Sequence, residues 1–304
     1  MVAGSLSRAD IDYVREVYQL FEEGDPAFLD RFTPDATLVF PETLPKGGTY
    51  GSPLEALEFW NNIGALFEYQ HAEPEEFIRD GDRLVVLGSF RGRASATGKE
   101  TTARFAHVIG LSGAAGPLSE HRFASFELIV DTAAVLAALG QEFAADWSDP
   151  ETPEPKRSQL ASANLSPEDV ESLREGYRRF REHDATFMDR YTPDAPCVFP
   201  TSLPAGGTYQ GPWEALEFMT TVSERVEDPH PEPQEFIRDG DRLVVLGRWY
   251  ALVPTTGRRA AVRIAHVFSL SGGDEPLSEQ QITSFEWLGD SAAFAAALAE
   301  AESG

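Results

Sequence analysis

Apolar positions along the chain change their period in a fixed order. Over 7–23 they recur at helical spacing behind a Ser-Asp capping pattern, which predicts a helix. The run Ser-Pro-Leu-Glu at 52–55 combines the cap, proline and glutamate of a second helix start. The period then falls to two, which predicts strands over 83–90, 102–111 and 118–130. Helices followed by a strand meander favour an α+β fold, with N-terminal helices packed on a curved antiparallel sheet.

The whole pattern occurs twice. VFPETLPKGGTY at 39–50 matches VFPTSLPAGGTY at 198–209, an offset of 198 − 39 = 159 residues. The run EFIRDGDRLVVLG occurs at 76–88 and, with the same offset, at 235–247. Self-similarity at a fixed long period indicates a duplicated folding unit.

The duplication divides the 304 residues into two domains of ordinary size. We expect a first domain over 1–139 and a second domain over 165–304. Between them, residues 140–164 contain three prolines and several charges, which is typical of a semi-rigid linker.

Composition excludes several classes of protein. Fifty acidic and 25 basic residues give a net charge of −25, which repels nucleic-acid phosphates. No apolar run is long enough to cross a membrane, and the N-terminus MVAGSLSRAD lacks the features of a signal peptide, so a cytoplasmic protein is expected. The single Cys197 cannot form an intrachain disulfide. Metal-binding and nucleotide-binding motifs are missing, so we expect no metal and no other cofactor.

Several motifs resemble the SnoaL-like branch of the nuclear transport factor 2-like superfamily. They are TPDA before the first strand, a Pro/Gly loop opening a helix, and a strand containing His-Val before a glycine-containing turn. That superfamily includes polyketide cyclases, ketosteroid isomerase, limonene epoxide hydrolase and non-catalytic binding or scaffolding proteins. The resemblance implies a cone with an apolar pocket in each repeat, and an intramolecular pseudo-dimer of the two repeats.

The resemblance to ketosteroid isomerase can be followed residue by residue. The isomerase has an aspartate base at the end of the first strand, where this chain has Phe40. The isomerase tyrosine falls next to Tyr18, and its protonated carboxylic acid falls at His107. Because a phenyl ring cannot accept a proton, steroid isomerisation by that mechanism is not expected. The corresponding residues of the second repeat are Phe199, Tyr177 and His266.

A histidine in an apolar pocket can donate or accept a proton near neutral pH. We therefore interpret His107 and His266 either as catalytic acid–base groups acting on a carbonyl, enol or epoxide oxygen, or as buried imidazoles bonded to a neighbour. The leading hypothesis is a cofactor-independent enzyme of secondary metabolism. It would cyclise, isomerise or open the epoxide of an apolar polyketide-like or terpenoid-like substrate. The alternative, favoured by Phe40 and Phe199, is a non-catalytic small-ligand-binding or scaffolding protein.

Strand alternation extends the expected pocket. If His107 faces inward, alternate residues of the last strand should face inward too, beginning with His121. His121 has no histidine counterpart in the second repeat, so the first pocket is the expected active one if only one is catalytic. His71 and His230 lie in a Pro- and Glu-rich connection and are expected at the surface. The expected pocket-lining residues are Tyr18, Phe40, Trp60, Phe105, His121, Phe123, Ser125 and Glu127, then Tyr177, Phe199, Met219, Gln280, Ser284 and Glu286.

Overall fold

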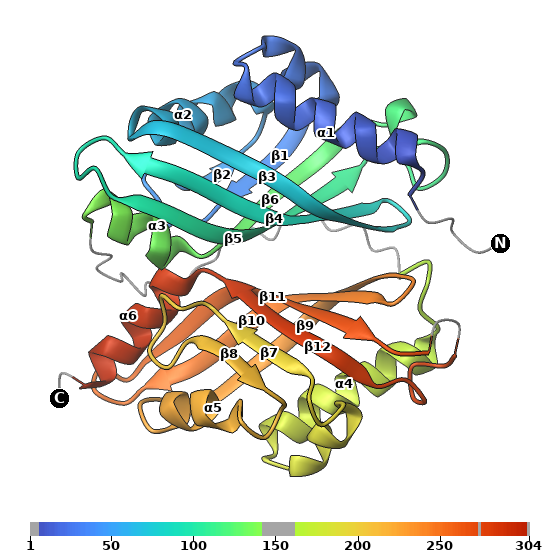
Figure 1. The fold of residues 1–304 in the computed structure, drawn as a ribbon, viewed down its shortest axis with the longest axis vertical. Coiled ribbons are helices and arrows are strands. Elements are labelled where there is room, and N and C mark those ends of the chain that lie inside the picture. The colour runs from blue at the N-terminus through green and yellow to red at the C-terminus, as the bar shows by residue number, and fades with distance from the viewer. Residues whose placement is uncertain (1–5, 142–161, 273–274, 303–304) are drawn as a thin grey trace. The chain divides into compact units, whose positions relative to one another are not determined.

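The structure, a computed structural model, describes residues 6–141, 162–272 and 275–302. The chain forms two compact units, the second of which contains the chain from Leu165 onward. Each unit contains helices and one sheet, which confirms the predicted α+β class (Figure 1). Most of the predicted linker over 140–164 lies outside the described residues. The predicted pairing of the two repeats stays a prediction.

The first domain begins with the predicted capped helix. The Ser7 hydroxyl accepts a hydrogen bond from the Asp10 backbone N–H, and the Asp10 carboxylate accepts one from the Ser7 N–H at 3.1 Å. Asp10 also accepts a bond from the Leu118 N–H at 2.6 Å, which ties the helix to the loop after the third long strand. The elements are α1 (Arg8–Glu22), η1 (Pro26–Arg31), β1 (Phe32–Phe40), β2 (Gly48–Tyr50), α2 (Pro53–Ala65), β3 (Phe67–Asp80), β4 (Arg83–Ala94), β5 (Glu100–Leu111), η2 (Leu118–Glu120), β6 (Phe123–Val130) and α3 (Thr132–Leu139).

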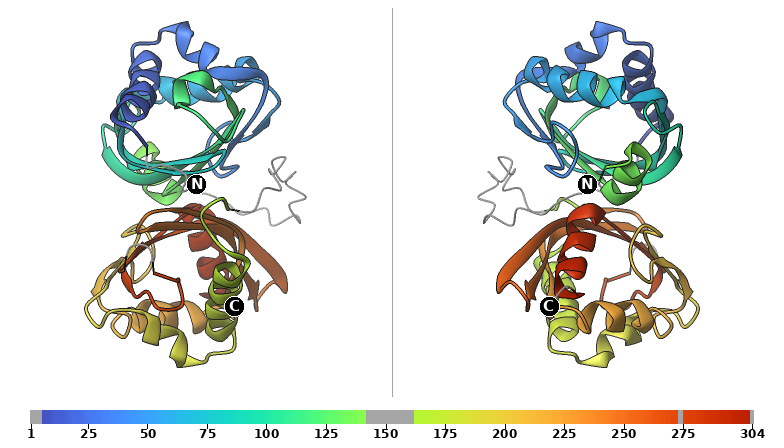
Figure 2. Two further views of the ribbon diagram at one scale, coloured as in Figure 1. Left: turned by 90° about the vertical axis from the view of Figure 1, so that its right-hand side faces the viewer. Right: turned by 90° about the vertical axis from the view of Figure 1, so that its left-hand side faces the viewer.

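Within the described residues, the first sheet has six strands in the order β2-β1-β6-β5-β4-β3. It is mixed, because β1 runs parallel to β6 whereas the other neighbours are antiparallel. The sheet curls around the helices of its own domain (Figure 2). A bulge after Pro74 brings the Glu73 carbonyl against Gly88, where an added Cβ would lie 2.2 Å from that oxygen. Glycine at this position therefore lets β3 approach β4.

Among the described residues, the second domain repeats this order without a counterpart of η2, and one of its helices starts differently. Gly211 stands where the first repeat has the capping residue Ser52, and the second helix has no side-chain cap. That helix starts only at Leu216. The elements are α4 (Pro167–Arg181), η3 (Ala185–Arg190), β7 (Pro196–Phe199), β8 (Gly207–Gln210), α5 (Leu216–Ser223), β9 (Glu227–Asp239), β10 (Arg242–Val253), β11 (Arg258–Leu270), β12 (Ile282–Gly289) and α6 (Ser291–Glu302).

Three features of the fold differ from the prediction. Each sheet contains one parallel strand pair, whereas an antiparallel sheet was expected. The Pro- and Glu-rich connection of each repeat forms part of a long strand, β3 or β9. Both are edge strands of their sheets, where proline is tolerated. The short strand β2 lies inside the predicted Pro/Gly loop. Among the described residues, no helix has the length and apolar character needed to span a bilayer.

Candidate functional site

A tyrosine and a histidine meet inside the first domain. The Tyr18 hydroxyl oxygen lies 2.6 Å from Nδ1 of His107, within hydrogen-bonding distance. Tyr18 is on α1, one turn after the fully buried Val14, and His107 is on β5. The Phe105 ring packs against the imidazole with 4.1 Å between ring centroids. The capped helix and the sheet thus hold the imidazole from two sides, and we call this pair the first dyad.

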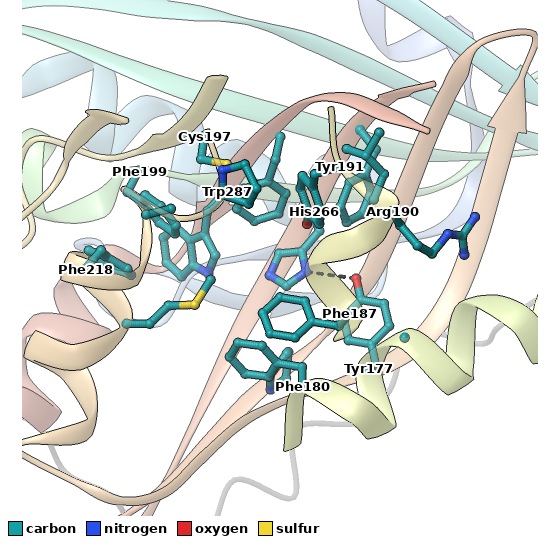
Figure 3. Close-up of a pocket in the computed structure, with 18 of the residues that line it drawn as sticks. Tyr177, Phe180, Phe187, Arg190, Tyr191, Cys197, Phe199, Phe218, His266 and Trp287 are labelled. Carbon is teal, nitrogen blue, oxygen red and sulfur yellow. Dashed lines mark hydrogen bonds between the residues drawn. The ribbon is translucent and has the colours of Figure 1, made fainter. Parts of the chain in front are cut away.

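The second domain contains the same pair, the second dyad. The Tyr177 hydroxyl lies 2.8 Å from Nδ1 of His266, which is only 7% exposed. Figure 3 shows this hydrogen bond, with the other ring nitrogen of His266 pointing away from Tyr177. Each dyad therefore leaves one imidazole nitrogen, Nε2, on the side away from its tyrosine.

Burial keeps both dyads neutral. It lowers the pKa of His107 and of His266 to about 3, because the charged imidazolium would lose its hydration. Burial also raises the pKa of the Tyr18 and Tyr177 hydroxyls, so both stay protonated. A neutral imidazole carries one ring proton. If the tyrosine donates to Nδ1, Nε2–H is a donor; in the other tautomer, Nε2 is an acceptor.

The first dyad lines a cavity of about 580 Å³. This volume falls within the roughly 300–1,000 Å³ of typical small-molecule pockets. None of the described residues bonds Nε2 of His107, which leaves that nitrogen available to a ligand. The walls are mainly aromatic: Trp60 meets Phe40 edge-to-face with 5.8 Å between ring centroids. Side chains in the lining include Tyr18, Phe40, Trp60, Phe105, Phe123, Phe126 and Leu128.

A second polar pair belongs to the lining of the first cavity. His71, on β3, is hydrogen-bonded through Nδ1 to the Glu22 carboxylate at the end of α1. Both side chains are close to half exposed, at 44% and 49%. They therefore stand where the cavity reaches the surface. Among the described residues, no group of three or more His, Cys, Asp or Glu side chains could hold a metal ion.

The second dyad lines a much smaller pocket, of about 160 Å³. Trp249 and Trp287 pack on Phe294 with 4.3 and 5.4 Å between ring centroids. Figure 3 shows Trp287, Phe199 and Phe218 on one side of His266. The lining of this second pocket includes the predicted residues Tyr177, Phe199, Met219 and His266.

The last strand of each domain presents a different set of side chains from the one that alternation predicted. On the β5–β6 ladder the partner of His107 is Leu128, so Leu128 shares its face and Glu127 lies on the opposite face. A bulge near the start of β6 returns Phe123 to the cavity side. Ser125 stays on the Glu127 side of the sheet, next to Gly110.

The remaining predicted polar residues make local bonds away from the pockets. His121 bonds the Ala115 carbonyl through Nε2 at 2.7 Å, and the Gln280 amide donates to the Glu275 carbonyl at 2.6 Å. The Ser284 hydroxyl donates to Ser269 at 2.7 Å. The residues that were expected to line a pocket and do not are His121, Ser125, Glu127, Gln280, Ser284 and Glu286.

His230 was expected at the surface and is instead only 2% exposed. Its Nδ1 lies 2.7 Å from the Asp228 carbonyl oxygen, and its Nε2 has no partner among the described residues. The predicted connection is part of strand β9, so His230 lies within the sheet. Sequence reasoning also missed Trp249, Trp287 and Phe294 in the second pocket. These three residues differ from their counterparts in the first repeat, and that difference could have indicated a changed pocket.

Solved structures similar to this chain each match about one of its two domains. A nuclear transport factor 2-like protein of unknown function from Burkholderia pseudomallei is 28% identical (44% of this chain, 98% of that chain, TM-score 0.38). TerC, crystallised with polyporic acid, is 26% identical (43% and 98%, TM-score 0.38). IdmH from Streptomyces antibioticus, named as a candidate polyketide cyclase, is 22% identical (43% and 98%, TM-score 0.36).

No curated protein matches the chain significantly. A family model described as "SnoaL-like domain" matches twice, over residues 14–121 and 173–274, which is more than half of the 304 residues. Each match lies in one of the two α+β domains and includes both residues of that domain's dyad. The chain therefore belongs to the SnoaL-like domain family, as a tandem of two such domains.

Proposed function

We propose that this chain is a cofactor-independent enzyme that transfers protons on a neutral, ring-containing substrate of polyketide-like or terpenoid-like character. Isomerisation and cyclisation are the reaction classes. One observation carries the proposal: an aromatic cavity of ligand size reaches a nitrogen of a partly buried, neutral imidazole, and no described residue bonds that nitrogen. Membership of the SnoaL-like family supports the same class of chemistry without naming a substrate.

The first dyad is suited to stabilise an enol or enolate oxygen. With Tyr18 donating to Nδ1, the Nε2–H of His107 donates to a substrate carbonyl oxygen. As a proton leaves the neighbouring carbon, negative charge develops on that oxygen and the hydrogen bond strengthens. The low pKa of His107 keeps the imidazole neutral, so it acts as a hydrogen-bond donor and no imidazolium forms.

The carbon proton needs an acceptor other than the residue at the end of β1, because Phe40 stands there. Among the described residues that line the first cavity, Glu22 and His71 are the remaining acid–base pair. In the proposed reaction a proton moves from the substrate carbon to this pair and returns to a different carbon. The substrate is thereby isomerised without gain or loss of atoms.

Deuterium exchange tests the proposal without knowledge of the natural substrate. In D₂O, the protein should accelerate exchange of the protons next to the carbonyl of β-tetralone, followed by NMR. His107→Phe should remove the acceleration, because phenylalanine fits an apolar site but cannot donate a hydrogen bond. His121→Phe is the matched control, since His121 lies outside the cavity. Undiminished exchange in the His107→Phe, His266→Phe double variant would refute the proposal.

A non-catalytic binding protein is the second candidate, and the phenylalanine at the position of the isomerase base favours it. This function predicts tight binding of an apolar phenol in the first cavity and no accelerated exchange of β-tetralone by the unaltered protein. The same two measurements therefore separate an enzyme from a binding protein.

A further inference from the structure

The two dyads have the same chemical groups, but the cavities beside them differ in volume. The tyrosine–histidine distances are 2.6 and 2.8 Å, and both imidazoles are held neutral by burial. The cavities beside them measure about 580 and about 160 Å³. The smaller volume lies below the roughly 300 Å³ at which typical ligand pockets begin. It is close to the roughly 150 Å³ of an engineered apolar cavity that holds one benzene ring.

Three substitutions between the repeats place larger side chains in the second pocket and reduce its space. On one side of the second pocket, Trp249 and Trp287 pack on Phe294, which is 2% exposed. Helix α6 and strands β10 and β12 carry this aromatic cluster. At the equivalent positions the first repeat has smaller side chains in every case, and all three of them line the open cavity. With the offset of 159 residues, Trp249, Trp287 and Phe294 correspond to Phe90, Leu128 and Val135.

The smaller pocket has a hydroxyl group at a position where the first cavity has none. Tyr191 lines it at the position that Phe32 occupies in the first domain. Burial raises the pKa of the Tyr191 hydroxyl, and none of the described residues forms a hydrogen bond with it. This hydroxyl and Nε2 of His266 can both form hydrogen bonds with a ligand oxygen. The protein carries a net charge of −25, which favours neutral ligands over anions.

We propose that the two domains bind ligands of different size: the first takes a multi-ring molecule, and the second takes a single-ring phenol or enol. The aromatic cluster of Trp249, Trp287 and Phe294 sets the limit in the second domain. Tyr191 supplies a hydrogen bond there that the first domain lacks. The inference rests on the proposed function only in placing a ligand oxygen at each dyad, and it does not require turnover.

Calorimetric titration of the full chain with two neutral phenols tests this division. Hydroxypyrene, with four fused rings, should bind once per chain. Leu128→Trp combined with Val135→Phe should abolish that binding by filling the first cavity. Trp287→Leu combined with Phe294→Val should raise the stoichiometry to two. Two equivalents of hydroxypyrene on the unaltered chain, or none, would overturn the proposal.

Para-cresol, with one ring, tests the second pocket through a substitution that keeps the fold. Tyr191→Phe removes only a hydroxyl, and it should weaken para-cresol binding about fivefold, the worth of one hydrogen bond. Hydroxypyrene binding should not change. Unaltered para-cresol affinity in Tyr191→Phe would show that the second pocket does not bind the phenol. Because neither phenol reacts, one-to-one hydroxypyrene binding without β-tetralone exchange would refute the proposed function and leave this division standing.

Discussion

Acid should destabilise the second domain through His266. This imidazole is 7% exposed, and burial lowers its pKa to about 3 in the folded protein. In the unfolded chain the pKa returns to its ordinary value of about 6.5. Unfolding therefore takes up a proton between these two values. The stability that neutral His266 contributes is fully present above pH 6.5 and is lost progressively as the pH falls toward 3.

The size of the effect follows from the width of that window. Each pH unit inside it lowers the free energy of unfolding by about 1.4 kcal/mol. Lowering the pH from 7 to 5 should therefore destabilise the second domain by about 2 kcal/mol. The Asp169 carboxylate has a pKa below its ordinary value, although burial alone would raise it, because hydrogen bonds from Ser166 and Leu277 outweigh the burial. It consequently titrates at lower pH and does not account for the loss.

Amide hydrogen exchange, resolved by mass spectrometry, can measure this loss in each domain separately. Peptides from β11 report on the second domain and peptides from β5 report on the first. In His266→Leu, the β11 peptides should lose about 2 kcal/mol less protection between pH 7 and pH 5 than in the unaltered protein. His230 is present in both proteins, so their difference isolates His266. His107→Leu is the matched control and should change only the β5 peptides. An equal acid-induced loss in His266→Leu and the unaltered protein would show that His266 is not held neutral by burial.

Three further predictions concern stability, each measured by urea denaturation with amide exchange to assign the domain. Phe294→Ala should destabilise the second domain by about 3–5 kcal/mol, because a 2% exposed ring is replaced by a cavity; a loss below about 1 kcal/mol would show that the aromatic cluster collapses to fill it. Asp10→Asn should destabilise the first domain by roughly 1–2 kcal/mol, because the carboxylate caps α1 and accepts a hydrogen bond from the Leu118 N–H. An unchanged midpoint of urea denaturation would contradict this. Gly47→Ala should lower stability by about 1–3 kcal/mol, because its Cβ would lie 1.8 Å from a backbone oxygen. Gly176→Ala, in open space within α4, should raise it by about 0.5–1 kcal/mol; the same sign for both substitutions would refute the reasoning.

Local rules predicted most of the first domain's architecture. Helix starts were readable because Ser7 and Ser52 carry caps whose chemistry acts within four residues. Strands β4 and β5 were located, although residues 84–89 of β4 are buried without alternation. The early part of β3 was missed because its glutamates and Pro74 lower strand propensity, whereas pairing with β4 overrides that propensity. No short-range signal encodes such pairing.

The candidate site was less predictable, because it depends on register. The dyad histidine was found from the resemblance alone, and its partner Tyr18 from its place beside the isomerase tyrosine. Glu127 was misplaced because alternation counted across two strands needs to know which residues pair, and His107 pairs with Leu128. The bulge then shifts the count again before Phe123. Neither the register nor the bulge has a signature in the local sequence.

Comparison of the two repeats shows why the dyad alone cannot establish chemistry. A buried histidine must be hydrogen-bonded in either role, so the contact with Tyr18 or Tyr177 serves the fold as well as a reaction. What differs between the domains is the space next to Nε2. If the imidazole is only structural, His107→Phe and His266→Phe should have similar consequences, which would be confined to stability. If the open cavity makes His107 reactive, only its loss removes proton transfer from a multi-ring ligand, while the stability effects of the two substitutions remain comparable.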